Sequence, residues 1–227
     1  MIQLKNLSRE FQVGNQVVHA LDAIDLSISQ GDYVSIMGVS GCGKTTLLNI
    51  LGLLDTPSSG DYILSGINTS EMNDDEMANI RSTKIGFIFQ SFHLIPRLTA
   101  AENIEIPMIL AGHSQKMRAE KVAKALARVN LTDRSDHRPE QLSGGQRQRV
   151  AIARSIVMEP EVLLADEPTG NLDSTSGAEI VELIEELNQG GLTLILVTHD
   201  KEIGKRSSRV IRLLDGKIIS NQTQQGI

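Results

Sequence analysis

The sequence of 227 residues predicts an α/β protein in which a mostly parallel sheet follows an antiparallel β section and is interrupted by a helical section. Three observations support this fold class. Apolar and polar residues alternate near the N-terminus, short apolar strands alternate with helical patterns in two regions, and the region between them is helical. We expect one domain, with a core of about residues 1–90 and 158–227 and a helical subdomain of about residues 91–157.

The first 90 residues are predicted to hold a small antiparallel sheet and the first strand–loop–helix unit. Residues 2–7 and 24–28 alternate apolar with polar side chains, as half-buried antiparallel strands do. The apolar segment Tyr33–Met37 is typical of a buried strand, and a glycine-rich loop separates it from a helix expected over 45–54. A strand at 62–64, a helix at 75–81 and a buried strand at Ile85–Phe89, which leads into Gln90, follow.

The helical section carries two start signals. Thr99 and Glu102 match a capping box, in which the Thr oxygen and the Glu carboxylate bond free amides of the first turn. A second helix is expected to begin near Ser114, since Val122 and Leu126 begin an apolar stripe at helical spacing.

Strands and helices alternate again after residue 160. We expect a strand at 162–165, a helix that ends at residues 190–191, and a buried strand at 192–197. Asp215-Gly216 is a two-residue hairpin signal between strands at 210–214 and 217–219. Residues 221–227 are expected to fray.

Composition excludes several classes of protein. The net charge of −6 and the pI near 5.4 disfavour nucleic-acid binding, which depends on clustered Lys and Arg. Cys42 is the only cysteine, so an internal disulfide and a cysteine-based zinc site are excluded and a cytosolic location is expected. The sequence has neither a secretory signal nor about 20 continuous apolar residues, so membrane association is expected only through a partner.

One loop has the pattern of a phosphate-binding loop. It lies between a predicted strand and a predicted helix, as that loop requires, and consists of Gly38, Val39, Ser40, Gly41, Cys42, Gly43, Lys44 and Thr45. The glycines let backbone amides turn towards phosphate oxygens, Lys44 is expected to reach the β- and γ-phosphates, and Thr45 can ligate magnesium. A chance match to the pattern is the alternative.

Two further segments suit phosphate chemistry. Asp166 and Glu167 end a buried strand, where Asp166 would hold magnesium and Glu167 would act as general base; a solvated acidic loop is the alternative. Residues 142–146, Leu-Ser-Gly-Gly-Gln, place Ser143 at a helix N-cap and so have the parts of a second anion site. A flexible loop before a helix is the alternative there.

Together these motifs resemble the ABC ATPase family over essentially the whole chain. The resemblance implies a P-loop NTPase fold of the RecA-like type, with ATP and Mg²⁺ as cofactors. It also implies a head-to-tail homodimer in which Ser143, Gly145 and Gln146 contact ATP bound by the partner. The family elements that remain are an adenine platform at Phe11, the nucleotide-binding Thr46, the Q-loop Gln90, the D-loop residues 171–173 and the switch His199.

Three of these residues, and Cys42 of the phosphate-binding loop, also have an ordinary structural interpretation. Phe11 suits stacking on adenine, where the family usually has Tyr, but it also suits a core position. Gln90 is implied to contact magnesium or the lytic water, and His199 the γ-phosphate, although either suits a structural polar role. At Cys42 the family usually has Ser or Gly, so the thiol is either reactive, beside Lys44 and a helix N-terminus, or an inert filler. The other histidines lack metal-ligand spacing.

Residues 89–96 and 98–103 resemble the branch that contains the macrolide-exporting and lipoprotein-releasing ATPases, MacB-like and LolD-like. This implies a transport ATPase that powers a separate membrane permease from the inner face of the cell membrane, for export or extracytoplasmic release. A mechanotransmission ATPase of cell division or envelope sensing is the alternative, and a DNA-repair or translation ATPase is a third class. Phe92, Leu94 and Ile95 are expected either to dock the permease or to pack inside the helical section.

Overall fold

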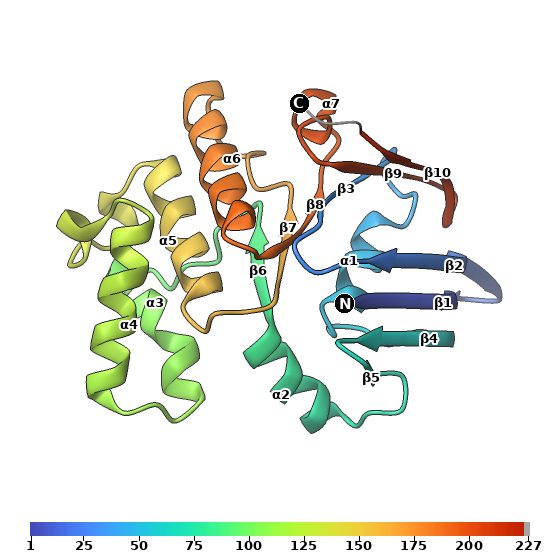
Figure 1. Cartoon of the computed structure of the whole chain (residues 1–227), viewed down its shortest axis with the longest axis horizontal. Coiled ribbons are helices and arrows are strands. Elements are labelled where there is room, and N and C mark those ends of the chain that lie inside the picture. The colour runs from blue at the N-terminus through green and yellow to red at the C-terminus, as the bar shows by residue number, and fades with distance from the viewer. Residues whose placement is uncertain (225–227) are drawn as a thin grey trace. The chain divides into compact units, whose positions relative to one another are not determined.

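The computed structural model describes residues 1–224, and they form two compact units. The first unit consists of residues 1–81 and the chain after residue 190, and the second of residues 82–190. The α/β class expected from the sequence is confirmed, because antiparallel and parallel strands and a helical section are all present (Figure 1). Among residues 1–224, no helix combines the length and the apolarity that a membrane span needs.

An antiparallel sheet in the order β2-β1-β4-β5 forms one part of the first unit. Its strands are β1 (Ile2–Val13), β2 (Gln16–Ile28), β4 (Ser59–Leu64) and β5 (Ile67–Asn68). Ile2 pairs with Ile28 and Leu4 with Leu26, and all four side chains are buried. The β1–β2 hairpin is much longer than expected, because its outer residues 10–19 are exposed on both faces and lack the alternation that marks a half-buried strand.

The other part of the first unit is built on parallel strands. β3 (Tyr33–Met37) pairs in parallel with β8 (Thr193–Val197) and with β9 (Arg209–Leu214), and β10 (Lys217–Thr223) returns antiparallel to β9. Helix α1 (Lys44–Leu51) follows β3, and the short helix α7 (Lys201–Gly204) follows β8. Helix α1 ends earlier than expected, since Gly52 caps it and Leu53 has a left-handed φ of 54°.

The hairpin predicted at Asp215-Gly216 is present, and both residues have positive φ angles, as a type I′ turn requires. Residues 221–223 do not fray, because they pair with residues 209–211 of β9. Gln224 is also held, since its amide donates to the Ser208 carbonyl oxygen at 2.8 Å. The rest of that expectation concerns residues 225–227, which lie outside the described part of the chain.

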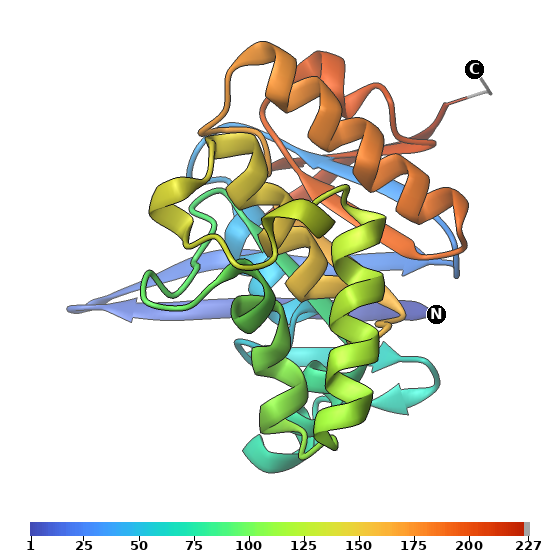
Figure 2. The ribbon, with the colours of Figure 1, turned by 90° about the vertical axis from the view of Figure 1, so that its left-hand side faces the viewer.

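The second unit contains a parallel strand pair and four α-helices. The strands are β6 (Ile85–Phe89) and β7 (Val162–Asp166), and α2 (Asp74–Lys84) leads into β6. The helices are α3 (Ala100–Leu110), α4 (Gln115–Arg128), α5 (Gly144–Ile156) and α6 (Ser174–Gln189), with short 3₁₀ turns at Thr132–Arg134 and Pro139–Gln141. Helices α3 and α4 lie side by side and both pack on α5 (Figures 1 and 2).

The helix starts in this unit follow the predicted capping chemistry. Thr99 accepts a hydrogen bond from the amide of Glu102, whose carboxylate accepts one from the amide of Thr99, so the capping box is confirmed. Ser114 caps α4, and Val122 and Leu126 are buried as the stripe predicts.

Candidate functional site

The glycine-rich loop connects β3 to α1 in the first unit. Gly43 immediately precedes α1 with a φ of 105°, and a Cβ at that position would lie 2.5 Å from the carbonyl oxygen of Ala20. The first helical hydrogen bond of α1 is donated by the Leu47 amide to the Gly43 carbonyl oxygen. The amides of residues 44–46 come before it and so have no acceptor within the helix. This helix start therefore offers backbone donors and positive potential to an anion.

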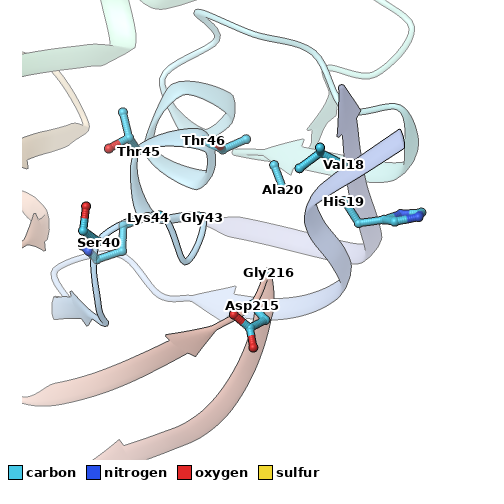
Figure 3. A pocket seen from close by; sticks show the side chains of 11 residues that line it. Val18, His19, Ala20, Ser40, Gly43, Lys44, Thr45, Thr46, Asp215 and Gly216 are labelled. Carbon is cyan, nitrogen blue, oxygen red and sulfur yellow. The ribbon is translucent and has the colours of Figure 1, made fainter. Parts of the chain in front are cut away.

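A cavity of about 420 Å³ opens at this helix start. Figure 3 shows that its lining comes from three places: the loop with the first turn of α1, strand β2, and the β9–β10 turn. The lining residues are Ser40, Gly41, Gly43, Lys44, Thr45 and Thr46 of the loop and α1, Val18, His19 and Ala20 of β2, and Asp215 and Gly216 of the turn.

Lys44 is held over its own loop. Its ammonium group donates hydrogen bonds to the carbonyl oxygens of Gly38 at 2.8 Å and Val39 at 2.9 Å. This places the charge beside the cavity that Lys44 helps to line, and Thr45 lines the cavity with an exposed side chain. The loop thus combines a cation, a hydroxyl and backbone donors, the set that a phosphate chain and its magnesium ion require.

Cys42 does not line this cavity. Its side chain is 2% exposed, and its Sγ would lie 2.5 Å from a Cβ placed on Gly38, so the sulfur fills the space beneath the loop. The amide of Gly216 donates to the Cys42 carbonyl oxygen at 3.1 Å, which ties the loop to the β9–β10 turn. These contacts favour the inert filler among the two roles considered for this thiol.

Phe11 lies on the outer part of the β1–β2 hairpin and is 38% exposed, so it is not a core residue. It pairs directly with Val18, which lines the cavity, and directly opposed residues of an antiparallel pair share one face. The guanidinium of Arg9 lies 4.7 Å from the Phe11 ring centroid. Arg9 is itself fixed by a two-point ion pair with Asp55, at 2.9 and 2.7 Å.

His199 follows β8, at the same end of the parallel strands as the phosphate loop. Ile36 of β3 is in register with Val197 of β8, and the amide of Thr198 donates to the Ile36 carbonyl oxygen. His199 is exposed, and Asp200 after it caps α7. The carboxyl end of parallel strands is where α/β sheets place their ligand sites, so His199 has a position suited to the expected role.

In the second unit the structure brings Gln90, Asp166 and Glu167 together at the ends of β6 and β7. Phe89 is in register with Asp166, so Gln90 and Glu167 occupy equivalent positions one residue beyond the two strand ends. Glu167 has a φ of 47°, a left-handed backbone conformation that is costly for a residue with a Cβ. Such strain is typical of functional positions.

The side chain of Gln90 lies against the D-loop. Asn171 donates from Nδ2 to the Gln90 carbonyl oxygen at 3.0 Å, and Gln90 Nε2 lies 3.4 Å from Asn171 Oδ1. A Cβ at Gly170 would lie 2.6 Å from Gln90 Nε2, so a larger residue there would displace the Gln90 side chain. Sequence reasoning placed Asn171 in the D-loop but did not foresee its bond to Gln90.

The second anion motif forms the start of α5. Ser143 caps the helix as predicted, accepting from the amide of Gln146 at 3.2 Å, while Gln146 accepts from the Ser143 amide at 3.0 Å. A Cβ at Gly145 would lie 3.2 Å from Ser176 at the start of α6. Ser143 is exposed and the three residues after it are half-buried, so the start of α5 lies at the surface of this unit.

Several residues of the first-unit cavity were missed by sequence reasoning. Val18, His19 and Ala20 belong to no recognisable motif, and His19 received no role. Asp215 and Gly216 were recognised only as a turn. A hairpin signal marks where the chain reverses, but it does not tell which other loop the turn will meet.

Comparisons with known proteins agree with this geometry. The family model described as ABC transporter matches residues 21–170. The chain is 48% identical over 225 residues to the uncharacterized ABC transporter ATP-binding protein YknY of Bacillus subtilis (strain 168), covering 99% of this chain and 98% of that protein. It is 50% identical over 222 residues to the macrolide export ATP-binding/permease protein MacB of Burkholderia pseudomallei (strain 1710b), covering 98% of this chain and 34% of that protein. The chain therefore spans about a third of the length of MacB.

A solved structure extends the agreement to the fold. The dimeric, post-hydrolysis structure of the ATP-binding cassette MJ0796 bound to ADP and Pi superposes with a TM-score of 0.90 and 42% identity, over 100% of both chains. The fold and family predicted from the motifs are thereby confirmed. The chain belongs to the ABC transporter family.

Proposed function

We propose that this chain is the ATPase subunit of a transporter, and that ATP-driven dimerisation and hydrolysis power a separate membrane permease. The observation that carries the proposal is the cavity beside the phosphate loop, where Lys44, Thr45 and free helix-start amides converge. Among residues 1–224 no group of three His, Cys, Asp or Glu side chains is placed to hold a metal ion. Magnesium needs no such group, since it is usually held by one or two side chains together with phosphate oxygens and water.

The role of each site residue follows the family resemblance. We assign Gly38, Ser40, Gly41, the Cys42 backbone, Gly43, Lys44, Thr45 and Thr46 to the phosphates, and Phe11 to the adenine. Thr45, Gln90 and Asp166 are assigned to Mg²⁺. Glu167 would take the proton of the attacking water, and His199 would hold the γ-phosphate and orient Glu167. Three observations support these assignments. Gln90, Asp166 and Glu167 lie at the ends of β6 and β7, and Glu167 has a strained backbone. Phe11, Thr45 and His199 are exposed, so a ligand can reach them.

The homodimer is supported by the surface position of Ser143 and by the dimeric form of MJ0796. In the proposed head-to-tail arrangement, Ser143, Gly145 and Gln146 of one chain contact the γ-phosphate of ATP held by Lys44 of the other. Hydrolysis would remove that phosphate and so separate the two chains.

The permease partner is supported by the relatives. YknY is described as an ATP-binding protein and matches this chain over nearly its whole length, whereas MacB is described as combining an ATP-binding part with a permease. We place this chain at the inner face of the cell membrane through such a permease, serving export or extracytoplasmic release. The transported substrate is determined by the permease.

The test removes the general base and then blocks the dimer. Glu167→Gln should lower ATP turnover by about 10² to 10⁴-fold, while its phosphate and magnesium ligands remain. Light scattering should then find dimers in ATP and monomers in ADP. Adding Ser143→Arg should abolish the dimers without loss of ATP binding, because the arginine occupies the space of the partner's γ-phosphate. Dimers of the double variant in ATP would contradict the proposal.

A further inference from the structure

Helix α5 carries a buried amide whose role is not accounted for by the motif at its start. Gln148 lies on α5 five residues after Ser143, and its side chain is 0% exposed. Nε2 of Gln148 donates to the carbonyl oxygen of Pro168 at 2.8 Å and to that of Phe89 at 3.3 Å. Both acceptors belong to the backbone of the second unit.

The two carbonyl groups adjoin the two proposed site residues of this unit. Phe89 immediately precedes Gln90, and Pro168 immediately follows Glu167. Because a trans peptide is planar, fixing the Phe89 carbonyl group restricts the rotation of Gln90. Fixing the Pro168 carbonyl group holds the peptide between Pro168 and Thr169, directly after the residue that follows Glu167. One amide group therefore holds the chain next to both Gln90 and Glu167.

Packing alone does not explain a glutamine at this position. Within the described residues, Oε1 of Gln148 is buried and has no hydrogen-bond partner. An apolar side chain of the same length would fill the space without leaving that oxygen unsatisfied. The amide is thus explained by the two carbonyl groups that it holds rather than by the volume that it fills.

Other side chains of α5 hold the same segment beyond Gln90. Arg154 donates to the carbonyl oxygens of Phe92 at 2.9 Å and His93 at 2.6 Å, and the Arg147 guanidinium lies 5.1 Å from the Phe92 ring centroid. Residues 89–93 are therefore fastened to α5 on both sides of Gln90. Of these three side chains, Gln148 also reaches the loop that carries Glu167.

We propose that Gln148 is a positioning residue, which sets Glu167 and Gln90 relative to helix α5, whose N-cap is Ser143. This proposal rests on the proposed function. An α-helix transmits a displacement of its first turn along its axis because its hydrogen bonds keep it rigid, and Gln148 lies only about 7.5 Å along α5 from Ser143. Contact of Ser143 with the partner's nucleotide would thus be passed to the general base through one buried amide.

The test replaces the amide by an apolar side chain of similar length. Gln148→Met should lower kcat by about 10- to 100-fold, since a displacement near 1 Å of a catalytic group has effects of this order. The Kd for ATP should change by less than about twofold, because the phosphate loop belongs to the other unit. Ser155→Ala is the matched control, since its hydroxyl donates to the Ile152 carbonyl oxygen of the same helix. The kcat of this control should stay unchanged.

A double-mutant cycle separates positioning from general loss of structure. If Gln148 acts through Glu167, Gln148→Met should reduce the residual turnover by less than about twofold once Glu167→Gln is present. An equal fold-loss in both backgrounds, or an unchanged kcat of folded Gln148→Met, would overturn the inference. If Gln148→Met does not fold, Gln148→Asn, which keeps the amide but shortens its reach, should show the same pattern. An unchanged turnover of Glu167→Gln alone would instead contradict the proposed function.

Discussion

At the scale of single residues, Phe11 is held by charge rather than by packing. Arg9 lies over its ring, and Asp55 fixes Arg9 through two contacts. A cation over an aromatic face is attracted by the ring quadrupole, so this arrangement fixes the ring while it remains 38% exposed. A ring held in this way is ready to stack on a base without being ordered by it first.

We predict that Phe11→Ala raises the Kd for ATP by about 5- to 150-fold, since loss of one base–aromatic stack costs about 1–3 kcal/mol. Isothermal titration with ATP and with tripolyphosphate provides the measurement. Affinity for tripolyphosphate, which has no base, should not change, and Phe11→Tyr should bind ATP normally. Val13→Ala, also on the exposed hairpin, is the control. Equal losses for both ligands would disprove the stacking role.

Cys42 allows a second test at this scale. Because the thiol is 2% exposed and lies beneath the loop, a maleimide should not modify the folded protein, and mass spectrometry should find label only after unfolding in denaturant. Cys42→Ser should hydrolyse ATP at a rate close to that of the natural protein. Rapid labelling of folded protein that ATP suppresses would instead support the reactive thiol.

At the scale of secondary-structure elements, the start of α6 depends on a charged cap. Asp173 accepts a hydrogen bond from the amide of Ser176 at 3.0 Å. The backbone and side-chain hydrogen bonds of Ser176 lower the pKa of the Asp173 carboxyl below its ordinary value. The charged form is therefore preferred in the folded protein, where it also meets the positive end of the helix dipole.

This lowered pKa predicts an acid-dependent stability. A carboxyl whose folded pKa is depressed stabilises the protein above its unfolded pKa, near 3.9, and loses that contribution as the pH falls through the folded value. Asp173→Asn keeps a good N-cap but cannot ionise. The excess stability of the natural protein over this variant, from urea unfolding, should be largest near pH 7 and shrink below about pH 4. A difference that does not depend on pH would contradict the assignment.

At the scale of the whole molecule, the proposed function requires a surface that meets the permease. Phe92 and Leu94 are half-buried, while Ile95 is 45% exposed, just beyond Gln90. The expected docking strip is therefore only partly available, and Ile95 is the member best suited to contact a partner. The contacts of Arg154 with residues 92 and 93 link this strip to α5.

We predict that Ile95→Asp abolishes copurification with the permease while the isolated subunit keeps its basal ATPase rate. Leu110→Asp is the matched control, because Leu110 is 83% exposed at the end of α3 and the same charge is introduced there. Equal recovery of the permease with both variants would rule out Ile95 as a docking residue. If circular dichroism shows that the Ile95→Asp variant does not fold, Ile95 packs inside the second unit instead of contacting a partner.

The sequence by itself determined the features that depend on neighbouring residues. The phosphate loop, the Ser143 cap and the Thr99 capping box were predictable, because a turn, a helix start or an anion cradle is built from side chains and amides a few residues apart. Strand β6 was predicted with its observed bounds, since a short apolar run between polar residues is a local signal.

Only the tertiary structure decided which distant segments meet. Val18, Asp215 and Gly43 line one cavity although nearly 200 residues separate the outermost two, and nothing in the local pattern of β2 or the β9–β10 turn marks them as partners. Gln148 shows the same limit. In the sequence it is only a polar residue on a predicted helix, whereas in the structure its amide donates to two backbone carbonyl groups from distant segments. The physical reason is that local hydrogen bonding selects each element, whereas the burial of apolar faces selects which elements lie together.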